Sequence, residues 1–593
     1  MSALAARVNV AQIFPETPSL SLVPRTRICG CGGRMKVKKT RRREVVTMEV
    51  GPLSVQETVV ECLRCNAERG SEELAELVPP WSRYSYGVMV YVGRALFQQG
   101  KSELAVKEEL KKHNIDIARS EIGYLGKRFV AYLSIAHRES AEALKTHLAH
   151  QGGYILHLDG TCEGDSPFLM TGLDGISGIV LHNVKIASEK AESITPLLQE
   201  VLASLGAPIG VVSDMSKGID AAVREVFPKV PHFLCHFHFL RDIGKDLLEG
   251  DYDALRRSLR GYALKKKLRD LAKKCKAHID TDPKMKLALS HYVDEHIMGR
   301  PVETLPAVVL AYVLALWILN AKLSSSGQGF PFDRPHLSLY ERVAEVDELF
   351  AKKATLDQKH SLLANLRKVI HAVVQDQVLQ QVVERLREKA EVFDRLRAAM
   401  SIALPDSKSA LNDDGNSTSA ETIKEALTDF RADQKLISRA ESQLAYKKIL
   451  KQLDTYWNKL FADPINVQTL DGTQIIQPQR TNNSLERLFR RFKRTLRRKS
   501  GCHSLTKTLQ GILADTLLIN NLDNSDYLAL LLRGKSSMQQ RFAEINPKQV
   551  RKYLAELAAD DSPLRLPHGM KKLLRLSNLP KKLAVKPFFR LAA

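Results

Sequence analysis

The sequence lacks a hydrophobic run long enough to cross a bilayer. Its most apolar stretch, LPAVVLAYVLALWIL, covers residues 305–319 and contains a proline, whereas a membrane-spanning helix needs about 20 apolar residues. The N-terminal residues also lack the basic segment and continuous apolar segment of a secretory signal peptide. We therefore expect no membrane partner and a cytoplasmic location, and we interpret residues 305–319 as a buried helix.

Cysteine is scarce as well. Eight unevenly spaced cysteines in 593 residues exclude the disulfide framework of a small secreted domain. Four of them stand as Cys29-x-Cys31 and Cys62-x-x-Cys65, at the outer ends of two β-rich runs that flank Gly51-Pro52. Closing that hairpin would bring four thiolates together around a structural Zn²⁺. We interpret residues 25–78 as a zinc-ribbon-like domain, although C-x-C departs from the usual C-x-x-C spacing; the alternative is two unrelated pairs of reduced cysteines.

Acidic residues are too few to balance the basic ones. The chain has 89 Lys and Arg against 67 Asp and Glu, a net charge of +22. Such an excess favours a polyanionic partner, nucleic acid first and an anionic membrane surface second.

The shortage of acid is sharpest in residues 481–501, TNNSLERLFRRFKRTLRRKSG, where Glu486 is the only carboxylate. One reading is local: Asn483 and Glu486 have the spacing of a capping box at a helix start. In the other reading Glu486 is a metal ligand that faces DNA. The helical spacing supports this second interpretation. It predicts one apolar stripe along the helix and, next to it, a second stripe on which Glu486 is followed by basic residues. The apolar stripe is Leu485, Leu488, Phe489, Phe492 and Leu496, and its neighbour is Glu486, Arg490, Lys493 and Arg497.

Residues 79–150 have a helical pattern with breaks at Gly100 and at Asn114-Ile115-Asp116. In the last expected helix, Arg119, Lys127 and Arg128 are predicted to project away from the apolar stripe. A helix-turn-helix that docks a basic helix on DNA fits this pattern. Any three-helix packing unit would give the same pattern.

Residues 151–249 change to alternating strands and helices in the order βββαβαβ. The crossover helix before the fourth strand allows that strand to lie parallel beside the first. Asp159 and Asp214, at the carboxyl ends of these two strands, would then be neighbours. Two carboxylates and a third from Glu486 are the hard oxygen ligands that Mg²⁺ prefers. Asp174 and Asp220 are nearby acids that could be mistaken for ligands.

These residues resemble the RNase H-like catalytic domain of DDE transposases from bacterial insertion sequences. The resemblance rests on Asp159-Gly160-Thr161, Ser213-Asp214 and Asn483-x-x-Glu486, with Lys493 at the Glu-x6-Lys/Arg spacing. The resemblance covers about residues 150–510. Within this span the chain is similar to the Mutator-like and hAT-like groups, whose catalytic domain carries a helical insertion. The resemblance implies that Asp159, Asp214 and Glu486 hold two Mg²⁺ (or Mn²⁺) ions for DNA cleavage and strand transfer.

The resemblance also implies supporting residues. Cys235-x-x-His238 is similar to a C/D(2)H element of some of these groups, although strand alternation puts Phe233, Cys235, Phe237 and Phe239 on one core face. Asn483 would orient Glu486 or touch DNA. The expected DNA-binding residues are Arg119, Lys127, Arg128, Arg490, Lys493, Arg494 and Arg497.

We therefore expect a multidomain α+β and α protein whose mixed five-stranded α/β core is interrupted by an all-α insertion. It would be a nucleoid-associated transposase that acts as a dimer or higher homo-oligomer on double-stranded DNA, at element ends and at target sites. The alternatives are a transposase-derived DNA-binding regulator without catalysis and another RNase H-like metal-dependent endonuclease. The expected divisions are an N-terminal segment (1–24), the zinc ribbon (25–78), the helix-turn-helix (79–150), the catalytic core (151–249 and 476–520), the all-helical insertion (250–475) and a basic C-terminal region (521–593).

Overall fold

The computed structural model describes residues 16–299, 304–321, 327–353, 360–403, 419–469 and 472–559. The start of the expected N-terminal segment and the last part of the expected basic C-terminal region, from residue 560 onward, lie outside these residues. The chain divides into two compact units. The first contains the chain up to Phe233, Pro464–Pro478 and the chain from Asn482 onward, and the second contains Leu234–Asp463 with Gln479–Thr481.

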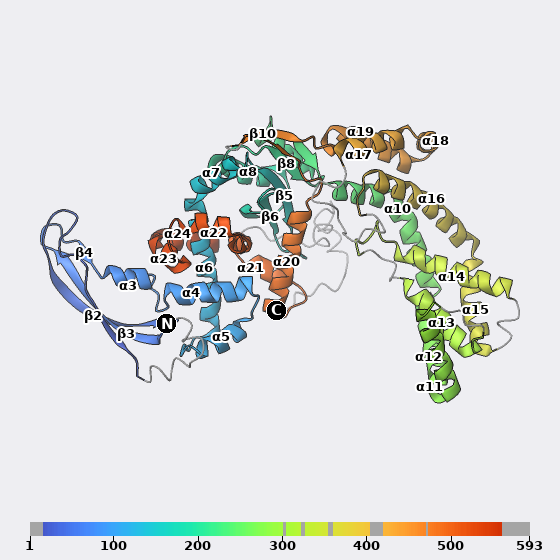
Figure 1. Cartoon of the computed structure of the whole chain (residues 1–593), viewed down its shortest axis with the longest axis horizontal. Coiled ribbons are helices and arrows are strands. Elements are labelled where there is room, and N and C mark those ends of the chain that lie inside the picture. The colour runs from blue at the N-terminus through green and yellow to red at the C-terminus, as the bar shows by residue number, and fades with distance from the viewer. Residues whose placement is uncertain are drawn as a thin grey trace, which may run out of the picture. The chain divides into compact units, whose positions relative to one another are not determined.

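The first unit begins with a long β-hairpin (Figure 1). Strands β2 (Met35–Thr47) and β3 (Gly51–Cys62) pair antiparallel along their whole length, from Met35↔Cys62 to Thr47↔Gly51. Strand β1 (Ser19–Leu22) pairs parallel with β3, and β4 (Glu68–Arg69) pairs antiparallel with its far end. A small core forms beneath α3 (Glu72–Leu77) from Leu22, Val45, Leu53, Val55, Leu74 and Val78.

Helices follow the hairpin and break where the sequence predicts. Gly100 and Asn114 both have positive φ, so each ends a helical segment with a left-handed residue. The segments are α4 (Tyr86–Gly93), the π-helical η1 (Arg94–Gln98), α5 (Glu103–Lys111), α6 (Arg119–Glu139) and α7 (Ala141–His150).

A mixed five-stranded sheet follows, in the order β7-β6-β5-β8-β9. The first three strands form an antiparallel meander, and β5 pairs parallel with β8. This confirms the expected α+β class and the strand and helix order of residues 153–234. The elements are β5 (Ile155–Thr161), β6 (Phe168–Asp174), β7 (Val180–Ile186), α8 (Ala191–Leu205), β8 (Gly210–Ser213), α9 (Lys217–Val226) and β9 (His232–Leu234).

The last part of the first unit is helical and packs around α6. Ser134 donates a hydrogen bond to buried Asp515, His137 shares one of 2.9 Å with the Tyr527 hydroxyl, and Arg541 forms an ion pair of 2.6 Å with Glu139. The described part of the expected basic C-terminal region therefore completes the core of the first unit. Its elements are α20 (Asn483–Ser500), α21 (Thr506–Gly511), the 3₁₀ helix η4 (Ala514–Asp523), α22 (Ser525–Leu532), α23 (Met538–Glu544) and α24 (Pro547–Ala559).

The second unit is built from helices. It begins at Leu234, the last residue of β9, whereas the sequence pattern predicts that the insertion starts at residue 250. The reason is α10 (His236–Gly261), which packs against α16, α19 and α14. Its other helices are α11 (Leu264–Thr281), α12 (Pro283–Ile297), α13 (Ala307–Leu319), α14 (Pro335–Lys352), α15 (Ser361–Val374), α16 (Gln377–Ala399), α17 (Ala420–Ala432), α18 (Gln434–Ser442) and α19 (Leu444–Leu460).

Two expectations for residues 250–475 can be compared with this architecture. Residues 305–319 form α13, which buries one face, and no helix among the described residues has the length and apolarity to span a bilayer. The expectation of an all-helical segment is wrong for its last residues. Strands β10 (Ile465–Thr469) and β11 (Gly472–Ile476) form an antiparallel hairpin that belongs to the first unit.

Candidate functional site

Asp159 lies near the carboxyl end of β5, where its side chain is 7% exposed. Its Oδ1 accepts a hydrogen bond of 2.8 Å from the backbone N–H of Gly160. That contact orients the carboxylate at the edge of the sheet.

Asp214 follows the last residue of the neighbouring strand. The parallel ladder of β5 and β8 ends by pairing Leu158 with Ser213, so Asp159 and Asp214 are the next residues on adjacent strands. Adjacent strands lie about 4.8 Å apart. The Asp214 Oδ1 accepts a hydrogen bond of 2.9 Å from the backbone N–H of Ser216, just before α9. The backbone register therefore brings these two acids to the same edge.

Glu486 lies in the first turn of α20 and is partly exposed. The capping-box reading is wrong, because the helix starts one residue earlier than that motif requires. The N-cap is Asn482, and its side chain makes no capping hydrogen bond. Asn483 is the first helical residue.

The Asn482 side chain instead fastens α20 to β5. Its Oδ1 lies 2.9 Å from Nδ1 of His157, and its Nδ2 donates a hydrogen bond of 2.9 Å to the carbonyl of Leu158. An amide oxygen only accepts, so His157 donates through Nδ1. Burial lowers the pKa of His157 to about 4, which keeps the ring neutral. This contact joins the start of α20 to the strand that carries Asp159.

The carboxylates of Asp159 and Glu486 consequently meet. Each offers an oxygen within 4.8 Å of an oxygen of the other. An Mg²⁺ ion with oxygen ligands at about 2.1 Å can bridge two atoms at up to about 4.2 Å, so a small movement suffices for joint ligation. These residues could hold a metal ion.

The apolar stripe of α20 is as predicted. Leu485, Phe489, Phe492 and Leu496 are buried and Leu488 is partly buried. The stripe presses the helix against the core of the first unit, so the remaining residues of α20 form its outer side.

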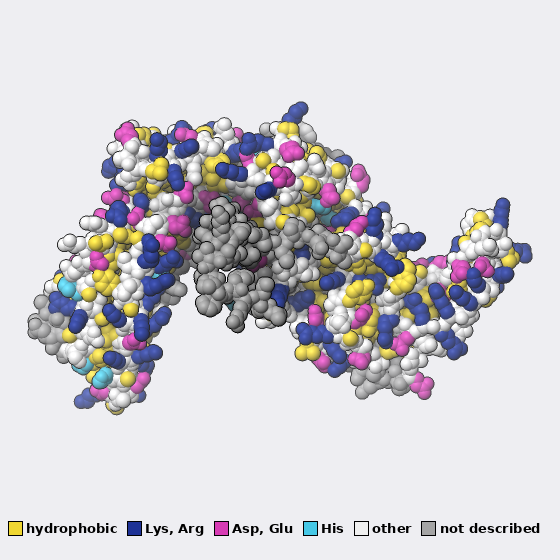
Figure 2. Space-filling model, turned by 180° about the vertical axis from the view of Figure 1, so that it is seen from behind, with side chains coloured by type: hydrophobic (Ala, Val, Ile, Leu, Met, Phe, Trp, Pro, Cys, Tyr) yellow, Lys and Arg dark blue, Asp and Glu magenta, His cyan; other side chains and the backbone are white. Residues whose placement is uncertain are grey.

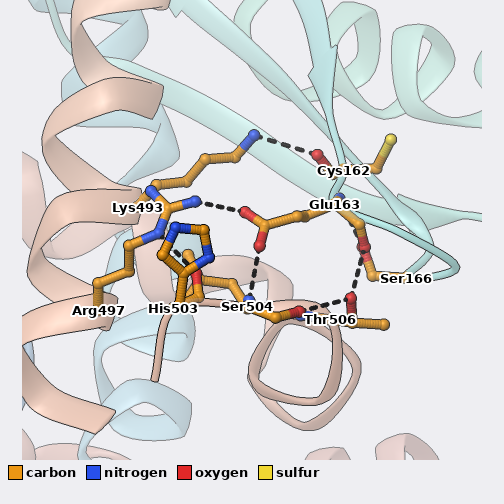
Figure 3. A network of polar contacts seen from close by, with 9 residues as sticks. Cys162, Glu163, Ser166, Lys493, Arg497, His503, Ser504 and Thr506 are labelled. Carbon is orange, nitrogen blue, oxygen red and sulfur yellow. Dashed lines mark hydrogen bonds and ion pairs between the residues drawn. The ribbon is translucent and has the colours of Figure 1, made fainter. Parts of the chain in front are cut away.

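A polar network anchors the loop after β5 to α20 and α21 (Figure 3). One carboxylate oxygen of Glu163 forms an ion pair of 2.6 Å with Arg497. The other oxygen accepts a hydrogen bond of 2.7 Å from the Leu505 N–H. Thr506 donates to the Glu163 carbonyl, and Lys493 donates a hydrogen bond of 3.1 Å to the carbonyl of Cys162. The network holds the strand that carries Asp159 against the helix that carries Glu486.

The four predicted basic residues of α20 thus fall into two groups. Arg490 and Arg494 are exposed. Lys493 and Arg497 are partly buried and bind the loop after β5.

The predicted basic face of α6 is only partly exposed. Arg119 and Lys127 are exposed, and Arg119 forms an ion pair of 2.9 Å with Glu103. The prediction for Arg128 is wrong, because its side chain is only 8% exposed. From that residue onward α6 is enclosed by the C-terminal helices, and Arg128 lies 5.8 Å from the centre of the exposed Tyr124 ring.

The four N-terminal cysteines come together at the end of the hairpin. Cys31 Sγ lies 3.6 Å from that of Cys62 and 3.5 Å from that of Cys65, and Cys29 lies 3.6 Å from Cys65. Ligands of a tetrahedral zinc at about 2.3 Å are themselves about 3.8 Å apart. Backbone N–H groups of Cys65 and Arg64 lower the pKa of Cys62 to about 6, which favours a thiolate. The cluster could therefore bind Zn²⁺.

The hairpin beside this cluster carries much basic charge. Figure 2 shows Lys and Arg side chains spread over it. On β2 the exposed basic residues are Lys36, Lys38, Lys39, Arg41 and Arg42.

The predicted strand across residues 233–239 is too long: it is wrong from Cys235 onward. Strand β9 ends at Leu234, and Cys235 is the N-cap of α10, so the strand alternation of Phe233, Cys235 and Phe237 does not apply. Cys235 and His238 are both buried. Their supporting role at the acids stays a prediction.

The two alternative acids have structural contacts. Asp174 is fully buried and accepts hydrogen bonds from the N–H groups of Ile155 and Ser177. Asp220 forms ion pairs with Arg224 and His232.

His157, Glu163 and Asn482 were not predicted from the sequence. Asn482 could have been found from the Asn-Asn pair before the helix, since either residue can be the N-cap. The strand alternation of β5 places His157 and Asp159 on the same face.

No protein-family model matches the chain, and a comparison with curated protein sequences found no match either.

Proposed function

We propose that this protein is a DDE-type transposase that binds the ends of a DNA element and catalyses metal-dependent cleavage and strand transfer. The observation that carries the proposal is the approach of Asp159 and Glu486, which are far apart in the sequence, to within 4.8 Å. The strand order β7-β6-β5-β8-β9 supports an RNase H-like core around these acids.

Asp159 and Glu486 would hold the metal ions, and Asp214 would join them from the adjacent strand end. Bound Mg²⁺ or Mn²⁺ would neutralise charge on the scissile phosphate and activate the attacking oxygen. The residues of the chain supply position. Asn482 sets the start of α20 against β5, and Glu163 fixes the loop after Asp159.

Exposed cations of the same helix would contact the DNA backbone. Arg490 follows Glu486 by one helical turn and Arg494 by two, so both project along a path that starts at the acids. Lys493 would bind phosphate by exchanging its contact with the Cys162 carbonyl. The cysteine cluster with its basic hairpin and the exposed start of α6 would recognise the element ends.

The test is strand transfer with a DNA fragment that carries the sequences flanking the gene. The conservative variants Asp159→Asn, Asp214→Asn and Glu486→Gln should each lower Mg²⁺-dependent strand transfer at least about 1,000-fold while DNA binding stays within about twofold. The neighbouring Asp174→Asn is unsuitable as a control, because Asp174 is buried. Asp165→Asn, an acid of the loop after β5, should retain activity.

Three outcomes distinguish the alternatives. Full activity of any one variant removes that acid from the site. Hydrolysis of DNA or of an RNA·DNA hybrid without joining would indicate another endonuclease. Specific end binding by an inactive wild-type protein would indicate a regulator derived from a transposase.

A further inference from the structure

A groove on the first unit combines the start of α6 with the end of α20 and with α21. It encloses about 440 Å³. Its charged lining residues are Glu103, Arg119, Lys127, Lys499 and Lys507. We refer to it as the α6–α20 groove.

Positive charge dominates the α6–α20 groove. Four cations face one carboxylate, and that carboxylate, on Glu103, is engaged in the ion pair with Arg119. Within the described residues, no carboxylate lies within ion-pair distance of Lys127, Lys499 or Lys507. Three unmatched ammonium groups in one concavity repel one another, and an anion would relieve that repulsion.

Lys499 is held in place and is not a freely mobile surface lysine. Its ammonium group lies 4.7 Å from the centre of the Phe97 ring, which is a cation–π distance. Burial and, to a smaller extent, the like charge of Lys127 lower the pKa of Lys499 against the opposing effect of Glu103. The side chain is thus ordered before any ligand arrives.

The groove also has an exposed aromatic side chain. Tyr124 is 50% exposed and lies three residues before Lys127 on α6. Cations interleaved with an exposed aromatic ring are typical of nucleic-acid contacts, in which the ring packs on a base or sugar while the cations bind phosphates.

We propose that the α6–α20 groove binds the phosphodiester backbone of DNA through Lys127, Lys499 and Lys507. This inference rests on the proposed function, and it adds a second point of contact to the acids. Lys499 is thirteen residues beyond Glu486 on the same helix, a distance of about 20 Å at 1.5 Å per residue. With a rise of about 3.4 Å per base pair, α20 would span about six base pairs between the scissile phosphate and the groove.

The experiment measures binding of the full chain to a 30-base-pair duplex of random sequence over a range of salt concentrations. The probe requires no knowledge of the element ends. Each lost phosphate contact lowers the slope of log K against log [salt] by about 0.9, so the double variant K499Q/K507Q should lower it by about 1.8.

Two further double variants serve as controls. K145Q/K229Q removes the same charge from exposed positions outside the groove and should leave the slope unchanged. K499R/K507R keeps both charges and should retain the wild-type slope, which separates loss of charge from loss of folding.

An unchanged slope for K499Q/K507Q would refute DNA binding by the α6–α20 groove. It would leave DNA binding elsewhere on the protein and the proposed catalysis in place. An equal decrease for K145Q/K229Q would also refute DNA binding by the groove, because the effect would then be one of net charge. If the wild-type protein binds no DNA, both the proposed DNA binding by the α6–α20 groove and the proposed function are refuted. Loss of strand transfer in Glu486→Gln with a wild-type slope would support the acids independently.

Discussion

Replacement of Asn482 by alanine tests how the start of α20 is fixed to the sheet. The variant removes the two hydrogen bonds of the amide, to His157 Nδ1 and to the carbonyl of Leu158. Both partners are buried, and a buried polar group left without a partner costs about 1–3 kcal/mol. We expect the free energy of unfolding of the first unit to fall by about 3 kcal/mol.

Hydrogen exchange measured by mass spectrometry on peptides from β5 is the suitable assay. A protein of two units need not unfold in one step, so a global melting curve would mix their contributions. A loss of about 3 kcal/mol corresponds to exchange about 100-fold faster where the exchange rate reports the opening equilibrium. Mg²⁺-dependent strand transfer should fall as well, because Glu486 would no longer be positioned.

Asn483→Ala is the matched control. Asn483 is the same residue type one position along the chain, is partly exposed and is the first residue of the helix. We expect it to cost less than about 1 kcal/mol, as is usual for a substitution away from the core. Equal exchange rates for the two variants would refute the assigned role of Asn482.

Three other predictions concern the cysteine cluster and the buried histidine. Cys62→Ser should remove bound zinc, measured by elemental analysis, and should weaken DNA-end binding at the same time; unchanged metal content would contradict the site. Gly33→Ala should also weaken zinc retention, because the added Cβ would lie 2.8 Å from the Cys62 sulfur, whereas Gly30→Ala adds a methyl group with open space around it; similar zinc affinities for the two would contradict this packing. Acidification from pH 6.5 to about 4 should lower the free energy of unfolding by about 3 kcal/mol, because unfolded His157 binds a proton in that range while folded His157, with a pKa of about 4, stays neutral. Hydrogen exchange of β5 peptides at a series of pH values, corrected for the pH dependence of the intrinsic exchange rate, measures this decline, and an equally steep decline in His157→Gln would contradict the assignment.

The sheet and its two aspartates could be predicted from the sequence because their signals are local. Short apolar strands separated by glycine turns define the meander, and each acid directly follows such a run. The right-handed crossover then leaves little freedom for the position of β8 beside β5. The observed pairing of Leu158 with Ser213 is the consequence.

Arg128 and the segment after β9 could not be predicted in the same way. Arg128 is polar and follows exposed Lys127, so helical spacing alone assigns it to the solvent side. Its burial depends on the tertiary packing of α6, which contacts α4, η4, α23 and α24, and helical spacing does not report that packing. At Cys235 the alternation of aromatic residues fits a strand, but the chain has already begun α10.

The meeting of Glu486 with Asp159 depends on two attachments made after the chain has left the first unit and returned. The β10–β11 hairpin provides the first: Val467 packs on Gly152 so closely that a Cβ at Gly152 would lie 2.4 Å from it, and Gly152 has a positive φ, so only glycine suits this position just before β5. Asn482 provides the second, at His157 and Leu158. One attachment lies just before β5 and the other lies on β5. The helix that follows therefore has a fixed starting point, and its first turn places Glu486 at the end of the strand where Asp159 lies. The long insertion between the acids therefore does not loosen the site, because the returning chain is attached at two points to the segment that carries the first acid.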